Sequence, residues 1–136
     1  MNIVIDTNIF ISALIRDGIT RDIITNMPYN LIFPEFELYE IKKHKDEIFA
    51  KSNLSEKEFN ILLLRLLNYV KIAPFDIIAK YQTPAFNIMG NIDKDDVLFI
   101  ATALAFNCSI WSDDKHFKHQ NVVKVLTTKE IINLLR

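Results

Sequence analysis

Acidic side chains follow two short apolar runs of this sequence. Asp6 comes directly after residues 3–5, and Asp113 and Asp114 come shortly after residues 109–111. Such runs are typical of strands that are buried on both faces of a parallel sheet. The carboxyl ends of parallel strands lie at one edge of the sheet, where α/β folds bind their ligands. If the two strands are neighbours, we expect these acids to face each other across that edge.

Two further groups of acids lie near the expected starts of helices. Glu37 and Glu40 are one helical turn apart in a charged stretch, and Asp93, Asp95 and Asp96 precede an apolar one. Aspartate is a favoured N-cap, and acids in a first turn are stabilised by the helix dipole. We therefore interpret Asp93 as a cap, and Glu37 and Asp95 as ordinary solvated side chains.

The convergence of several carboxylates favours a metal site. For Asp6 alone, capping of the following helix is at least as good an explanation as chemistry. Several carboxylates at one edge repel one another, however, and a bound cation removes that cost. Oxygen ligands without a cysteine or a histidine pair suit Mg²⁺ or Mn²⁺ rather than Zn²⁺. One or two such ions held by carboxylates can hydrolyse a phosphodiester bond.

The histidines and the single cysteine are weaker candidates. His44 lies one turn after Glu40, and His116 lies near the expected acidic edge, where it could contact a phosphate. A surface histidine explains both positions equally well. Cys108 is expected to be a small buried residue, and one cysteine excludes an intramolecular disulfide, as fits a reducing cytoplasm.

The composition predicts one globular domain that spans residues 1–136. Half of the residues are hydrophobic, and there are two glycines and four prolines, which is unlike a disordered chain. The start of the chain lacks the basic region and cleavage site of a signal peptide. The apolar runs are too short or too interrupted to span a membrane. We expect a cytoplasmic protein with no membrane partner.

Short apolar runs alternate with amphipathic stretches along the whole chain. The expected strands are residues 3–5, 31–33, 70–72, 109–111 and 122–125. The expected helices are residues 9–15, 20–25, 35–49, 56–69, 94–106 and 128–135, with two short pieces within 75–90 that separate at Pro84. This alternation predicts an α/β domain with a mostly parallel five-stranded sheet between two layers of helices.

Two helix starts carry the capping-box pattern, Ser55 with Glu58 and Thr127 with Glu130. The first of them opens helix 56–69, which is apolar around most of its circumference. Such a helix either lies between two layers or meets another subunit. We expect the second case, a homodimer.

Four stretches of the sequence resemble the PIN domain family and follow one another in the order that is typical of it. They are Ile3-Val4-Ile5-Asp6-Thr7-Asn8, then Glu40 in a helix after Pro34, then residues 93–103 with Asp93-Lys94-Asp95-Asp96, and then Trp111-Ser112-Asp113-Asp114-Lys115-His116-Phe117. The resemblance covers essentially the whole chain. Its length and start are similar to those of small prokaryotic PIN proteins, including the VapC-type toxins of toxin–antitoxin pairs.

The resemblance implies a three-layer α/β/α fold and a ribonuclease that depends on Mg²⁺ or Mn²⁺. The metal-binding and catalytic acids that it implies are Asp6, Glu40, Asp96 and Asp114. Asn8 matches a polar residue that supports the first acid, and Ser112 matches a residue that lines the site. We count Asp93 and Asp113 as accessory candidates. His116 is a departure, because the family often has an acid two residues after its fourth one.

The expected substrate is RNA, and a toxin would also have an antitoxin as its partner. If bound metal neutralises four carboxylates, the rest of the chain carries a net charge of about +3, compared with −1 for the whole chain. Candidates for phosphate contacts are Arg16, Arg21, Lys42, Lys43, Lys45, Lys115 and Lys118. A solvated charged face explains the same residues as well.

Other functions compete with this interpretation. A PIN-like nuclease of RNA processing and a catalytically inactive RNA-binding or scaffold protein are both open alternatives. A receiver-type signalling domain is disfavoured, because strand 70–72 ends in Ala73-Pro74 and has no aspartate to phosphorylate. An aspartate-nucleophile phosphatase is disfavoured, because Asn8 stands where that class has its second acid.

Overall fold

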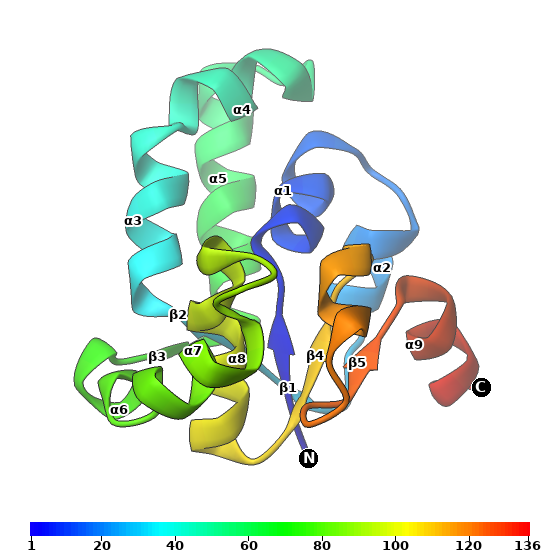
Figure 1. The fold of residues 1–136 in the computed structure, drawn as a ribbon. Coiled ribbons are helices and arrows are strands. Elements are labelled where there is room, and N and C mark those ends of the chain that lie inside the picture. The colour runs from blue at the N-terminus through cyan, green and yellow to red at the C-terminus, as the bar shows by residue number, and fades with distance from the viewer.

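Five short strands form one parallel sheet at the centre of the molecule (Figure 1). The computed structural model describes residues 1–136, except for the side chain of residue 94. The strands are β1 (Asn2–Ile5), β2 (Asn30–Pro34), β3 (Val70–Ala73), β4 (Ser109–Trp111) and β5 (Val125–Leu126). Their order across the sheet is β3-β2-β1-β4-β5, and every neighbouring pair is parallel. β1 and β4 thus lie side by side at the point where the strand order reverses, which is the condition for their acids to share one edge.

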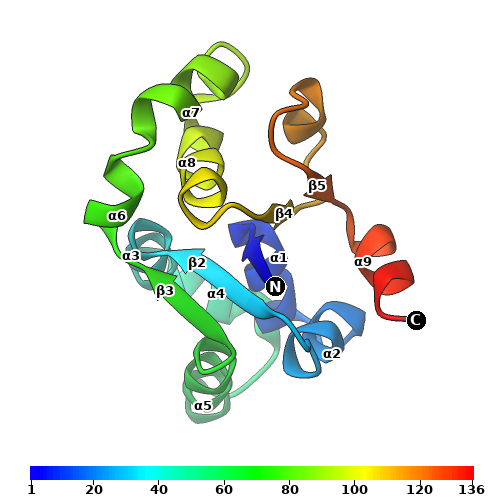
Figure 2. The same ribbon diagram turned by 90° about the horizontal axis from the view of Figure 1, so that it is seen from below.

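Helices cover both faces of this sheet and complete the predicted three-layer α/β/α fold. One layer contains α1 (Thr7–Ile15), α2 (Ile19–Thr25), α3 (Glu35–Lys43), α4 (Lys45–Ser52), α5 (Glu56–Leu67) and α9 (Thr128–Leu134). The other contains α6 (Phe75–Ala79), α7 (Gln82–Met89), α8 (Val97–Phe106) and the 3₁₀ helix η2 (Lys115–His119). A second 3₁₀ helix, η1 (Lys94–Asp96), leads into α8. Figure 2 shows α7 and α8 on one side of the strands and α2 and α5 on the other.

Alternate residues of the central strands pack into opposite cores. Ile3 and Ile5 of β1 pack with Trp111 on one face, and Val4 packs with Ile110 on the other. The strand register explains this division, because Val4 is paired with Ile110 and Ile5 with Trp111. All five side chains are fully buried. β1 is therefore held on both faces, which fixes the position from which Asp6 projects.

The charged stretch that was expected to form one helix over residues 35–49 forms two. His44 separates α3 from α4, with φ of −100° and ψ of 17°, outside the α-helical range. The helix axis changes direction there (Figure 1). Sequence periodicity does not reveal such a break, because the apolar spacing continues on both sides of it.

The predicted break at Pro84 is also wrong. The two helices α6 and α7 separate at Lys80 and Tyr81, and Pro84 lies in the first turn of α7. Proline is tolerated at that position, because the first N–H groups of a helix have no partner within it.

The last strand is shorter and lies later in the chain than the predicted residues 122–125. Gln120 accounts for the difference, because its side chain closes a loop over these residues. Its Oε1 accepts from the N–H groups of Val122 and Val123, and its Nε2 donates to the carbonyls of Phe117 and Val123. Only Val125 then joins the sheet from the predicted run.

Both predicted capping boxes are present, at the starts of α5 and α9. α5 lies at the outside of its layer, with Phe59, Leu63 and Leu66 buried. Ile61 and Leu64 are 57% and 66% exposed. No helix in the described part of the chain has both the length and the hydrophobicity that crossing a bilayer requires.

Candidate metal centre

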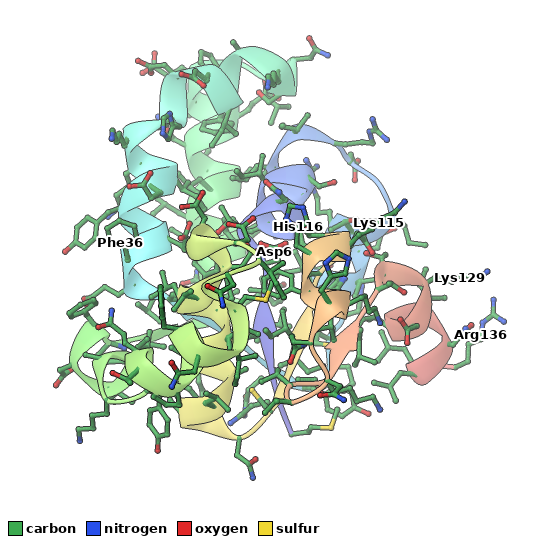
Figure 3. All side chains as sticks on the ribbon, viewed as in Figure 1. Asp6, Phe36, Lys115, His116, Lys129 and Arg136 are labelled. Atoms are coloured by element: carbon green, nitrogen blue, oxygen red, sulfur yellow. The ribbon has the colours of Figure 1, made fainter. Side chains whose placement is uncertain are left out.

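Asp6 projects from the end of β1, at the carboxyl edge of the sheet (Figure 3). It holds the N-cap position of α1, yet within the described residues its carboxylate makes no cap hydrogen bond. Instead the Ser112 hydroxyl donates to Asp6 Oδ2 at 2.6 Å. Asp6 is 6% exposed, and burial raises its pKa, with a further contribution from Asp114. The Ser112 hydroxyl and the nearby N–H groups of Thr7 and Asn8 act in the opposite direction. The Asp6 carboxylate thus bonds the Ser112 hydroxyl and also interacts with the first N–H groups of α1.

Ser112 connects Asp6 to Asp114. Its Oγ accepts a hydrogen bond from the N–H of Asp114 at 3.0 Å, and its O–H donates one to Asp6. Asp114 Oδ1 in turn accepts from the N–H of His116 at 2.9 Å, which caps η2. One buried hydroxyl thus fixes the carboxylate that follows β1 and the backbone that follows β4.

Asp96 reaches the same place from the end of η1. It is 7% exposed, and its Oδ2 has no hydrogen-bond partner among the described residues. Burial raises its pKa to about 7, and the charges of Asp93, Asp114 and Asp6 act in the same direction. Asp6 and Asp114 therefore lie close enough to Asp96 for their charges to raise its pKa, and we call these three residues the acidic cluster. An anionic Asp96 is costly there unless a cation balances it.

Asp93 and His116 form a second, more exposed part of the centre. Asp93 Oδ1 accepts from the N–H of Asp95 at 2.9 Å, so it bonds the first turn of η1. The helix that Asp93 was expected to cap begins later, at Val97, with Asp96 at its N-cap. The bond from Asp95 is the main reason why the pKa of Asp93 is lowered. Asp93 Oδ2 lies 3.0 Å from His116 Nδ1 and raises the pKa of that imidazole. Donor atoms of Asp93, Asp96 and His116 lie within 4.8 Å of one another.

Glu37 is the residue that the sequence interpretation underrated. Its Oε2 accepts from the Thr7 hydroxyl at 2.9 Å, which ties α3 to the segment after Asp6. Burial raises the pKa of Glu37, and Glu40, Asp6 and Asp95 add to the effect. The only sequence signal was its position one turn before Glu40, on the same helix face.

Glu40 lies one helical turn after Glu37 on α3, and its charge adds to the raised pKa of Glu37. Glu40 Oε2 is 3.8 Å from His44 Nε2. Glu37, Glu40 and Asp95 line a groove of about 870 Å³, together with apolar side chains such as Phe36 and Phe75. The groove also includes Thr7 and Asn8, which follow Asp6 in the chain.

Asn8 and Asp113 occupy different surroundings. Asn8 has an exposed side chain that lines the same groove. Asp113 turns away, because its two carboxylate oxygens accept from the N–H and the hydroxyl of Thr128, both at 2.7 Å. Asp113 thus anchors α9, and the structure does not bring it to the acidic cluster.

Comparisons with known proteins agree with this geometry. No curated protein sequence matches the chain. The chain is similar to the crystal structure of VapBC2 from Rickettsia felis bound to a DNA fragment from their promoter, with a TM-score of 0.70 and 15% identity, over 93% of this chain and 98% of that one. At this identity the similarity shows a shared fold. The PIN domain family model matches residues 4–136, which confirms the resemblance seen in the sequence. The chain belongs to the PIN domain family.

Proposed function

We propose that this chain is a nuclease that hydrolyses phosphodiester bonds of RNA with the help of Mg²⁺ or Mn²⁺. One or two ions would be held by Asp6, Glu40, Asp96 and Asp114. The observation that supports this most strongly is the buried Asp96 oxygen, which has no partner among the described residues. Burial and the charges of Asp93, Asp114 and Asp6 raise the pKa of this side chain. Three acids from separate segments do not gather in this way without a cost to folding.

The residues present fit a divalent cation. The acidic cluster offers carboxylate oxygens, which are the ligands that hard cations prefer. A bound ion supplies positive charge that stabilises the phosphate and activates water. The protein supplies the fixed positions: Ser112 orients the Asp6 carboxylate, and the bond from Thr7 to Glu37 keeps α3 against the end of β1. Glu40 can position a water or a ligand from the groove wall.

Contacts within the fold reduce the set of cations that are candidates for binding phosphate. Arg21 donates from Nε to the Ala13 carbonyl at 2.8 Å. Lys118 donates to the Val125 carbonyl at 2.8 Å and pairs with Glu130. These two cations already have partners within the fold. Exposed lysines are then the better candidates, and they include Lys42, Lys43 and Lys115.

RNA cleavage by the Asp6→Asn variant tests the proposal. We expect the wild type to cleave end-labelled single-stranded or hairpin RNA in Mn²⁺ and not in EDTA. Asp6→Asn should be slower by about a hundredfold or more, because it removes a charged ligand from a buried position. Asp22→Asn, an exposed acid on α2, is the matched control and should cleave like the wild type.

Wild-type rates in Asp6→Asn, or cleavage that persists in EDTA, would contradict the metal-nuclease proposal. RNA binding without any cleavage would instead support the alternative of a catalytically inactive RNA-binding protein.

We further propose that the chain is the toxin of a toxin–antitoxin pair and forms a homodimer. The similarity to VapBC2 over nearly the full length of both chains supports the first part. The exposed Ile61 and Leu64 on α5 support the second, because two apolar side chains on one helix surface suit a partner subunit. Light scattering should give twice the chain mass for the protein alone. Co-expression with the product of a small neighbouring gene should give a heavier complex. A monomeric protein would contradict the homodimer. The absence of a complex with the neighbouring gene's product would contradict the toxin proposal.

A further inference from the structure

His116 stands at the acidic edge in place of a carboxylate, and it faces the centre with a nitrogen. Its Nδ1 lies 3.0 Å from Asp93 Oδ2 and 3.6 Å from Asp114 Oδ1. Two neighbouring ligands of one octahedral ion are about 3 Å apart when each bond is about 2.1 Å. The separation between His116 and Asp93 is therefore that of two neighbouring ligands, and the donor atoms of Asp93, Asp96 and His116 all lie within 4.8 Å of one another.

Independent support comes from Asp96. Its Oδ2 is buried without a partner among the described residues, and the residue belongs to the same group of donors as Asp93 and His116. A buried carboxylate oxygen without a donor requires a proton, an ordered water or a cation. Of these, a cation also offsets the repulsion between neighbouring carboxylates. The three residues come from η1, the segment before it and η2, so the arrangement arises from tertiary packing.

The backbone holds this arrangement in place. Asp93 Oδ1 is occupied by the N–H of Asp95, which leaves Oδ2 directed at His116. The N–H of His116 is bonded to Asp114 Oδ1, which orients the start of η2. His116 itself is about half exposed, so its ring can rotate to present a nitrogen to an ion without disturbing the core.

We propose that His116 is a direct nitrogen ligand of the metal centre, with Asp93 and Asp96 as its carboxylate partners, and that this mixed set makes the centre prefer Mn²⁺ to Mg²⁺. This inference rests on the proposed metal-dependent function and specifies its cation. Imidazole is a good ligand for transition metals, whereas Mg²⁺ prefers oxygen and retains water. Asp93, which the sequence analysis counted as an accessory candidate, is in this proposal a direct metal ligand.

Electron paramagnetic resonance of the Mn²⁺-loaded protein without RNA tests this inference. We expect electron spin-echo modulation from a coupled imidazole ¹⁴N in the wild type and its loss in His116→Ala. Calorimetry should show Mn²⁺ affinity reduced about tenfold or more in this variant, with Mg²⁺ affinity changed much less. His116→Asp should lose the nitrogen signal and gain affinity for Mg²⁺. His119→Ala is the matched control, because His119 lies on the same 3₁₀ helix with its ring centre 6.4 Å from that of His116.

The two proposals fail in different ways. A nitrogen signal that is absent from the wild type, or that persists in His116→Ala, overturns the assignment of His116. If the His119→Ala variant also loses the nitrogen signal, the assignment of His116 is overturned as well. RNA cleavage by a protein without the signal leaves the nuclease function intact, whereas nitrogen-coupled Mn²⁺ in a protein that cleaves no RNA removes the nuclease function alone.

Discussion

The Asp96→Asn variant should lose RNA cleavage by about a hundredfold or more and, in EDTA at pH 8, should unfold at a higher temperature than the wild type. The two effects have one cause. Asp96 is almost fully buried beside the carboxylates of Asp6 and Asp114, so its charge costs folding energy when no cation is bound. Asparagine keeps the shape of the side chain and removes its charge. Its amide N–H groups can donate hydrogen bonds to the neighbouring carboxylates. The same change removes a carboxylate that a bound cation requires.

Thermal denaturation and RNA cleavage measured on the same preparation test this expectation. We expect a melting temperature raised by about 3 °C or more in EDTA. In Mn²⁺ the order should reverse, because the wild type alone gains fully from the bound ion. Asp22→Asn should leave both properties unchanged. An Asp96→Asn protein that is less stable than the wild type in EDTA would show that the charge is balanced within the fold.

The stability of the metal-free wild type should fall as the pH rises from about 4 to about 7, and saturating Mn²⁺ should remove most of that fall. In the folded protein Asp96 has a pKa of about 7, raised from 3.8 by burial. Between these two values the folded state holds a proton that the unfolded state has released, so each rise in pH favours unfolding. Above pH 7 the full penalty is present, on the order of several kcal/mol.

Other groups act in the same sense. Burial also raises the pKa of Asp6 and Glu37 from their ordinary acidic values. The bond to Asp93 raises the pKa of His116 above 6.5, so its stabilising charge is lost only as the pH rises beyond that value. The lowered pKa of Asp93 matters only in more acidic solution. Urea denaturation in EDTA from pH 5 to 8 measures the slope, and Mn²⁺ at a hundred times its Kd should add about 2.7 kcal/mol at pH 8. If the stability without metal did not depend on pH, the raised pKa of Asp96 would be contradicted. The Asp96→Asn variant should show a clearly smaller change of stability with pH than the wild type.

Local patterns in the sequence predicted the elements that carry the site, because each depends on neighbouring residues. The apolar run before Asp6 and the capping boxes at Ser55 and Thr127 are confirmed. The pairing of β1 with β4 was only a condition of the sequence argument, and the structure meets it. The PIN resemblance, now confirmed by the family match, rests on the same stretches.

The parts that the sequence did not predict depend on contacts between distant residues. The bond from Thr7 to Glu37 spans 30 residues, and that from Ser112 to Asp6 spans 106. The helix break at His44 and the loop closed by Gln120 leave no periodic signal either. The outward direction of Asp113 could not be predicted, because it depends on where Thr128 of α9 comes to lie.

The segment from Trp111 to Asp114 serves two neighbours with alternate residues. Trp111 Nε1 donates to the Thr128 hydroxyl, which in turn donates to Asp113, so both side chains anchor α9. Ser112 donates to Asp6, and its own hydroxyl oxygen receives the N–H of Asp114. A shift of the chain by one residue would point the anchoring side chains at the acids and the acids at α9. The attachment of the C-terminal helix α9 therefore determines which residues after β4 point towards the acidic cluster.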